Sequence, residues 1–336
     1  MREHKKSHLG IMGWAMFLAG AMSLGSCSSD ETLESMEPKA ITFGSVSMEN
    51  HSRAAYDPSY GQTTNLLDQF KVWGTVKGNT NTTVKIFNGA EITRGQAAYG
   101  TAWTQTSGSA QYWIPSATYN FMAIANATDV DFGPENAPSD LPIAINYTAD
   151  GETDLLFGEL ANKGIKTVTT DATATPNPAG PVAFTMTHLL SKVHFTFEDS
   201  NGNPVTNTEI SNIQVTGHYA SGTYNIGGEN QGWGSQVLAT TSPLSFGGID
   251  ANDTEATTSQ YARLIIPGTQ TWSITFAQNG TTIDEPLILE GETADTGYTF
   301  APNTQYNILV TVGSNITFTI NSLEAWGAEQ NIPLNP

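Results

Sequence analysis

Apolar and polar residues alternate along most of the chain from Ile41 onward, with the period of a β-strand that buries one face. We find no stretch of ten residues with apolar positions at the spacing of an α-helix. Clusters of Gly, Asn, Pro and Thr separate the alternating stretches and are typical of turns. The pattern therefore predicts an all-β protein, with strands at residues 41–46, 70–76, 119–125, 182–186, 193–197, 213–217, 272–276, 306–312 and 316–320.

A proline-rich segment without large apolar residues interrupts this pattern at residues 169–181. It leaves about 130 residues before it and about 155 after it, and both lengths are typical of single domains. A long loop inside one sandwich is the alternative interpretation. We predict two β-sandwich domains, at residues 41–168 and 182–336, joined by this segment as a linker.

The N-terminus has the features of an export signal. Basic residues precede an apolar run from Leu9 to Leu24, which is shorter than the roughly 20 residues that span a membrane. The run leads directly into Leu24-Gly25-Ser26-Cys27, and Cys27 is the only cysteine in the chain. This end resembles a bacterial lipoprotein signal peptide over residues 1–26, with lipid on Cys27 and a polar tether over residues 27–40. An ordinary signal peptide with a chance cysteine is the alternative.

The chain carries 32 acidic against 13 basic side chains, for a net charge of -19. Such a balance repels phosphate backbones, so we expect no nucleic-acid partner. Phosphate-binding loops, nucleophile elbows and metal-ligand spacings are absent from the sequence, so we expect no catalytic site, metal or cofactor. We expect His194 to face solvent from its strand, and His188 to bond locally at a strand end.

Two tryptophans, Trp103 and Trp233, lie in stretches of Gly, Thr, Ser and Gln that are typical of loops. Aromatic rings in such loops can stack on sugars, which makes a glycan-binding surface one hypothesis. The competing interpretation is that most tryptophans fill the sandwich cores, since each buries a large apolar area.

Several motifs, in this order, resemble the fimbrillin family of Bacteroidetes over nearly the whole chain. They are the lipoprotein start, Ile41-Thr42-Phe43, Arg53-Ala54-Ala55, Phe70 to Gly74, Tyr112 to Pro115, Asp154 to Gly158, Thr187 to Phe195, Tyr298 to Phe300 and Tyr306 to Val310, with Trp326 near the end. The resemblance implies two transthyretin-like antiparallel β-sandwich domains and a lipoprotein exposed on the outer membrane; Ser28 to Glu31 is similar to the acidic export signal of such lipoproteins. It also implies trimming by an Arg-specific protease, assembly with other fimbrial subunits by strand exchange, and adhesion to host or bacterial surfaces as a stalk, anchor or tip subunit.

Three arginines follow the signal peptide: Arg53, Arg94 and Arg263. Arg263 lies in an apolar stretch that predicts a protected strand, whereas Arg53 lies among small and polar residues. We expect processing between Arg53 and Ala54, with Arg94 as the second choice.

Cleavage there would free the strand at residues 41–46, in which Ile41, Phe43 and Ser45 are expected to face one side. The alternative is an ordinary edge strand followed by a solvated loop. Two other function classes are compatible with the sequence: a glycan-binding surface lipoprotein and, less favoured, a secreted hydrolase.

The position of Cys27 generates the first prediction. A palmitate analogue supplied to cells should label the wild-type protein and leave Cys27→Ser unlabelled, because no other thiol exists to accept an acyl chain. Metabolic labelling followed by gel fluorescence measures this. Label retained by Cys27→Ser would refute lipidation at this residue.

Overall fold

The computed structural model describes residues 38–48, 67–80, 82–94, 103–132, 140–159, 162, 164–177, 180–205, 209–227, 229–240, 242–249, 259–289, 292–293 and 295–325. Within these ranges the chain forms strands and turns with no α-helix, which confirms the all-β prediction. The predicted signal peptide, Cys27, and the pair Arg53 and Ala54 lie outside the described residues.

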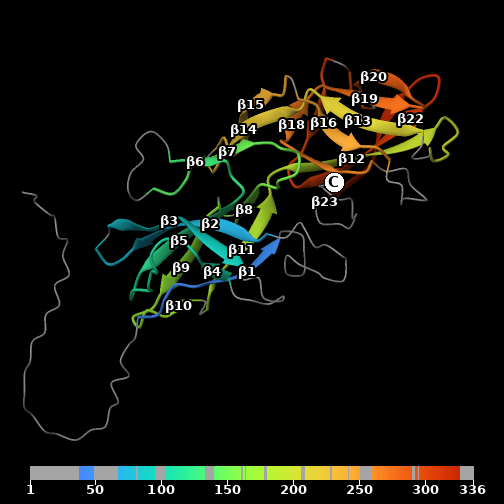
Figure 1. The fold of residues 1–336 in the computed structure, drawn as a ribbon. Helices are drawn as coiled ribbons and strands as arrows, with labels where there is room; N and C mark the ends of the chain where they lie inside the picture. Colours follow the sequence, from blue (N-terminus) through green and yellow to red (C-terminus); the bar gives the residue numbers. More distant parts are fainter. Residues whose placement is uncertain are drawn as a thin grey trace, which may run out of the picture. The chain divides into compact units, whose positions relative to one another are not determined.

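The N-terminal half of the chain forms a sheet of nine strands. Its main order is β1-β11-β8-β5-β2-β3-β4, and β9 pairs with both β5 and β10. Figure 1 draws these strands in blue to yellow-green. They are β1 (Phe43–Met48), β2 (Gln69–Lys77), β3 (Thr83–Arg94), β4 (Trp103–Gln105), β5 (Thr118–Ala125), β8 (Leu156–Gly158), β9 (Lys166–Thr170), β10 (Pro176–Asn177) and β11 (Val182–His188).

The central strand β5 is buried on both faces. Tyr119 and Phe121 pack into a cluster that we call the N-terminal core, together with β1, β2, β3 and β11. Met122 and Ile124, on the opposite face, pack into a different cluster. This two-sided burial explains why the apolar alternation of β5 becomes a continuous apolar run toward its end.

Two four-stranded sheets enclose the C-terminal core. One has the order β17-β12-β22-β23 and the other β16-β13-β19-β20. Val193, Phe195 and Phe197 of β12 point into this core, as the alternation predicts. A separate pair joins β18 to β21. The strands are β12 (Ser191–Asp199), β13 (Ile210–Thr216), β16 (Leu244–Gly247), β17 (Arg263–Ile265), β18 (Gly268–Gln270), β19 (Trp272–Gln278), β20 (Thr281–Leu287), β21 (Tyr298–Phe300), β22 (Thr304–Val312) and β23 (Thr317–Ala325).

Most of the described strand pairs are antiparallel, as the family resemblance implies, but two pairs are parallel. β12 pairs with β22 in parallel from Ser191–Thr304 to Asp199–Val312, and β1 pairs with β11 in parallel. Parallel neighbours need a long connection between them. Both pairs have one, because nine described strands lie between β1 and β11 and another nine between β12 and β22. Alternation in the sequence reports which face is buried and carries no information on strand direction.

A third core joins the two halves of the chain, and we call it the junction core. Its buried members are Trp73, Met122, Ile124, Ile145, Tyr147, Leu155, Phe157, Leu189, Leu190, Tyr224, Ala262, Leu264 and Ile266. A sheet of order β15-β14-β7-β6 contributes to it. In this sheet β6 (Asp129–Asp131) and β7 (Ala144–Thr148) precede the proline-rich segment, whereas β14 (Tyr219–Asn225) and β15 (Gly232–Leu238) follow it.

The proline-rich segment at residues 169–181 does not separate two sheets. Its first residues end β9, and Pro176 and Asn177 form β10 against Thr170 and Thr169. The next strand, β11, still belongs to the nine-stranded sheet through its pairing with β8 and β1. The chain changes sheets after His188, at the apolar pair Leu189-Leu190, where no turn residue marks the change.

His194 is buried, contrary to the expectation that it faces solvent. Its side chain is fully enclosed, and neither ring nitrogen has a hydrogen-bond partner. The residue opposite on β22 is Asn307, also buried, which accepts a 3.0 Å hydrogen bond from Thr196 instead. The face of β12 opposite the C-terminal core is therefore covered as well. Burial, and secondly the nearby Lys192 charge, lower the pKa of His194 to about 4.

This environment predicts an acid-sensitive fold. The folded-state pKa of His194 lies below the ordinary value of about 6.5, so the unfolded chain binds the proton more tightly. The stability that neutral His194 contributes is complete above about pH 6.5 and is lost toward about pH 4. In urea unfolding, the free-energy difference between wild type and His194→Leu should change by up to about 3 kcal/mol between pH 7 and pH 4. A difference that stays constant with pH would contradict the assignment.

Candidate functional site

β1 and the residues before it pair with two separate parts of the N-terminal half. Ile41 donates its backbone N–H to the Gln111 carbonyl (2.8 Å), and Trp113 donates to the Lys39 carbonyl (3.0 Å). Further along, Phe43 to Met48 pair in parallel with β11, the neighbour of β1 in the sheet order (Figure 1). Residues 39–48 thus pair first with the 111–113 segment and then with β11, and we call the space that they occupy the slot.

The side chains of this strand reach deep into the N-terminal core. Ile41, Phe43 and Val46 are all at most 5% exposed. The Phe43 ring lies 5.5 Å from that of Phe87, 6.2 Å from Phe121 and 6.3 Å from Phe184, measured between ring centroids. Aromatic pairs at these separations add to the apolar area that they bury. Phe43 therefore occupies a pocket whose walls come from β3, β5 and β11.

The spacing of the buried positions differs from strict alternation. Ile41 and Phe43 are both buried, as expected of residues that share a face. The pairing with β11 then shifts between Phe43 and Val46, as at a β-bulge, and Val46 is the next buried side chain described. The Ser45 side chain lies outside the described part, so its predicted orientation stays a prediction.

Gly44 allows the close approach of β1 to the chain that enters β11. A Cβ atom placed on Gly44 would lie 2.9 Å from the Pro181 Cβ. The Val182 N–H donates to the Thr42 carbonyl at 2.8 Å, which joins the same two segments. A larger residue at position 44 would push these two segments apart.

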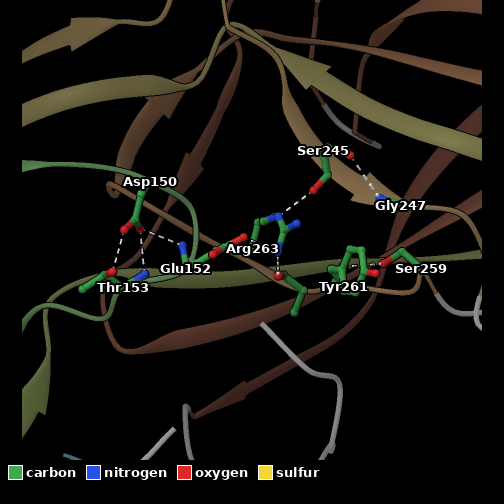
Figure 2. A network of polar contacts seen from close by, with 9 residues as sticks. Asp150, Glu152, Thr153, Ser245, Gly247, Ser259, Tyr261 and Arg263 are labelled. Carbon is green, nitrogen blue, oxygen red and sulfur yellow. Dashed lines mark hydrogen bonds and ion pairs between the residues drawn. The ribbon is translucent and has the colours of Figure 1, made fainter. Parts of the chain in front are cut away.

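The two described arginines are both held by the fold. Arg94, the last residue of β3, bonds to Asp68 through its side chain (2.9 Å) and through its backbone N–H (2.9 Å). Arg263 in β17 is 6% exposed, which confirms that it is protected within a strand. It donates to the Ser245 carbonyl (2.5 Å), faces Glu152 (3.6 Å) and lies over the Tyr261 ring, as Figure 2 shows.

His188, Trp103 and Trp233 all make structural contacts within the fold. His188 ends β11, as expected, and its Nδ1 lies 2.5 Å from the Asp154 Oδ2. Trp103 and Trp233 lie in strands β4 and β15 rather than in loops. The Trp103 ring contacts Phe70, and Trp233 contacts Tyr147 and Tyr224 while its Nε1 donates to the Leu189 carbonyl at 2.7 Å. Both strands bury few large side chains, so their sequences lack the apolar alternation that would have predicted strands, and their small polar neighbours suggested loops.

The described residues contain neither a cluster of metal ligands nor a membrane-spanning helix. No three side chains of His, Cys, Asp or Glu among them gather closely enough to hold a metal ion. No described helix is long and apolar enough to cross a membrane.

Several solved bacterial proteins have a fold similar to that of this chain. Solved structures with a similar fold include candidate cell adhesion proteins from Bacteroides uniformis (TM-score 0.52, 87% of this chain and 99% of that one) and Bacteroides ovatus (0.54, 88% and 99%), and a fimbrial protein from Bacteroides vulgatus (0.50, 85% and 99%). Each is 15% identical in sequence, so these matches establish the fold alone.

No curated protein sequence matches the chain. A family model described as fimbrillin-like matches residues 34–326, a range that contains every described strand. The chain therefore belongs to the fimbrillin-like family.

Proposed function

We propose that this protein is a non-enzymatic subunit of a cell-surface fimbria that joins its neighbours by β-strand exchange in the slot filled by residues 39–48. Membership of the fimbrillin-like family supports a fimbrial role on the cell surface. The observation that carries the strand-exchange step is the position of β1, an apolar strand at the end of the sheet order. Its connection to β2 contains Arg53.

Removal of this strand would leave a slot that needs refilling. The backbone groups of the 111–113 segment and of β11 that now bond to residues 39–48 would lose their partners. The aromatic walls around Phe43 would also be exposed to water. Unpaired strand edges above apolar pockets are favourable sites for an added strand, which restores the hydrogen bonds while its alternate side chains fill the pockets.

Cleavage after Arg53 is the proposed trigger. Arg53 lies five residues after Met48, the last residue of β1, so a cut there frees the strand from β2 without removing any residue that pairs with β11. The freed strand would leave together with the tether and the lipid proposed on Cys27. A subunit that keeps this strand would instead stay anchored to the outer membrane, and adhesion to host or bacterial surfaces is the function proposed for the assembled fimbria.

The orientation of the tryptophans weakens the glycan-binding alternative. That hypothesis rested on Trp103 and Trp233 in exposed loops, and both rings pack against other aromatic rings of the fold. A sugar-stacking platform needs an aromatic face open to solvent, and both of these side chains are half-buried by such contacts. Strand exchange is therefore the better supported of the two functions.

Proteolysis tests the proposed trigger. An Arg-specific protease should cut the wild-type protein first between Arg53 and Ala54, because Arg94 and Arg263 are held by ion pairs within or at the end of strands. Size-exclusion chromatography with mass spectrometry should then show oligomers. Arg53→Ala should stay monomeric under the same treatment, while Arg94→Ala, the matched control, should behave as wild type. A first cut at Arg94, or a cut at Arg53 that never yields oligomers, would end the strand-exchange proposal.

Packing of Phe43 predicts a large stability loss on truncation. Phe43→Ala should lower the free energy of unfolding by about 3–5 kcal/mol, since it opens a cavity among three phenylalanine rings. Val84→Ala on β3 is the control, because Val84 is 52% exposed and its truncation should cost less than about 1 kcal/mol. Urea unfolding followed by tryptophan fluorescence measures both. Equal losses in the two variants would show that β1 is not part of the stable core.

A further inference from the structure

The loop between β7 and β8, residues Asp150 to Leu155, holds its own shape through hydrogen bonds. The Asp150 Oδ1 accepts from the backbone N–H groups of Glu152 (2.8 Å) and Thr153 (2.7 Å), and its Oδ2 accepts from the Thr153 hydroxyl (2.5 Å). Figure 2 shows this arrangement beside Arg263. Burial alone would raise the pKa of Asp150, but these hydrogen bonds lower it, so the carboxylate stays charged at neutral pH. The loop is therefore preformed.

The loop is tied to strands that precede it in the chain. The Tyr147 hydroxyl, on β7, donates to the Thr153 carbonyl. The Asn126 side chain, next to the end of β5, donates to the Asp154 carbonyl at 2.7 Å. Both bonds fix the loop to the N-terminal half.

The same loop is tied to β17 in the C-terminal half. The Leu264 N–H donates to the Gly151 carbonyl at 2.8 Å, and the Arg263 guanidinium faces the Glu152 carboxylate at 3.6 Å. In Figure 2 Arg263 lies between Glu152 and Ser245, so one guanidinium connects the loop, β17 and β16.

Two more contacts lie where the chain passes from β11 to β12. Asp154 pairs with His188 at 2.5 Å, and the Leu189 N–H donates to the Leu155 carbonyl at 3.0 Å. The Leu155 side chain is fully buried in the junction core beneath these bonds. The loop thus bonds to four strands or strand ends from both halves of the chain, namely β5, β7, β11 and β17.

Gly151 is the point where the loop meets the C-terminal sandwich most closely. Its φ of +81° lies in the left-handed region that favours glycine. A Cβ there would lie 2.5 Å from the Leu244 Cδ1 and 3.2 Å from the Arg263 Cδ. A side chain at this position would strain the backbone and force the Leu244 and Arg263 side chains out of their present positions.

We propose that the Asp150–Leu155 loop is a clamp that couples the two sandwiches, so that both unfold in one cooperative transition. The N-terminal and C-terminal cores are separate clusters, and proteins whose parts have separate cores commonly unfold in steps. The junction core and the β7–β14 pairing bring the halves together. The clamp adds directional bonds that hold β17, the edge strand of the C-terminal sandwich, in register with that junction.

Differential scanning calorimetry of the full-length protein tests the clamp. Wild type should unfold in one transition whose calorimetric and van't Hoff enthalpies agree. Gly151→Ala should split this into two transitions separated by at least about 5 °C. Gly280→Ala is the matched control: its φ is +78°, but no atom lies within 4 Å of the added Cβ. It carries the same backbone strain and should retain one transition.

A second variant keeps the test decisive if Gly151→Ala does not fold. Glu152→Gln keeps the side-chain size and removes the charge that faces Arg263, and it should lower the ratio of van't Hoff to calorimetric enthalpy below that of wild type. Limited proteolysis near the first transition should release one resistant sandwich from each clamp variant. Two independent transitions in wild type, or a single agreeing transition in every folded clamp variant, would overturn the proposal.

Discussion

Burial of the central strands on both faces is the constraint on which the rest of the structure depends. β5 sends Tyr119 and Phe121 into the N-terminal core and Met122 and Ile124 into the junction core. A strand placed in this way cannot be left half-covered, because its second apolar face would be exposed to water. The β15-β14-β7-β6 sheet and β17 supply the cover. The connection between the two halves is therefore a requirement of the nine-stranded sheet itself.

Strands with strict alternation could be predicted from the sequence, and those shaped by their neighbours could not. Alternation located β2, β5, β12, β19 and β22 because each has at least one large apolar face. β14 and β15 are short of large apolar residues and owe their strand conformation to pairing with β7 and to the tertiary contacts of Trp233. The change of sheet after His188 also escaped prediction. Leu189 and Leu190 continue an apolar stretch there, whereas the prolines upstream suggested a linker.

The shared buried face of Ile41 and Phe43 could be predicted from the sequence, whereas the pairing shift after Phe43 could not. Ile41 and Phe43 share a buried face because the sequence alternates there, but the pairing shift that brings Val46 into the core depends on contacts with β11. His194 shows the same limit. A polar residue at an alternating position predicts exposure, and here the outer face of β12 is covered too, which only the tertiary structure reveals. Arg263 was correctly predicted to be protected because apolar residues flank it on both sides.

The shift within β1 also bears on aggregation. A regularly alternating apolar strand is the kind of segment that most readily stacks into fibrils, and an open slot that accepted any such strand would be a hazard on a crowded cell surface. The buried positions 41, 43 and 46 do not match strict alternation. A regular strand that fills the first two pockets would therefore turn its residue at position 46 to the face opposite the core. The narrow space at Gly44 excludes bulky residues as well. Under the proposed strand exchange, the irregularity of the slot would select against the addition of unrelated regular strands.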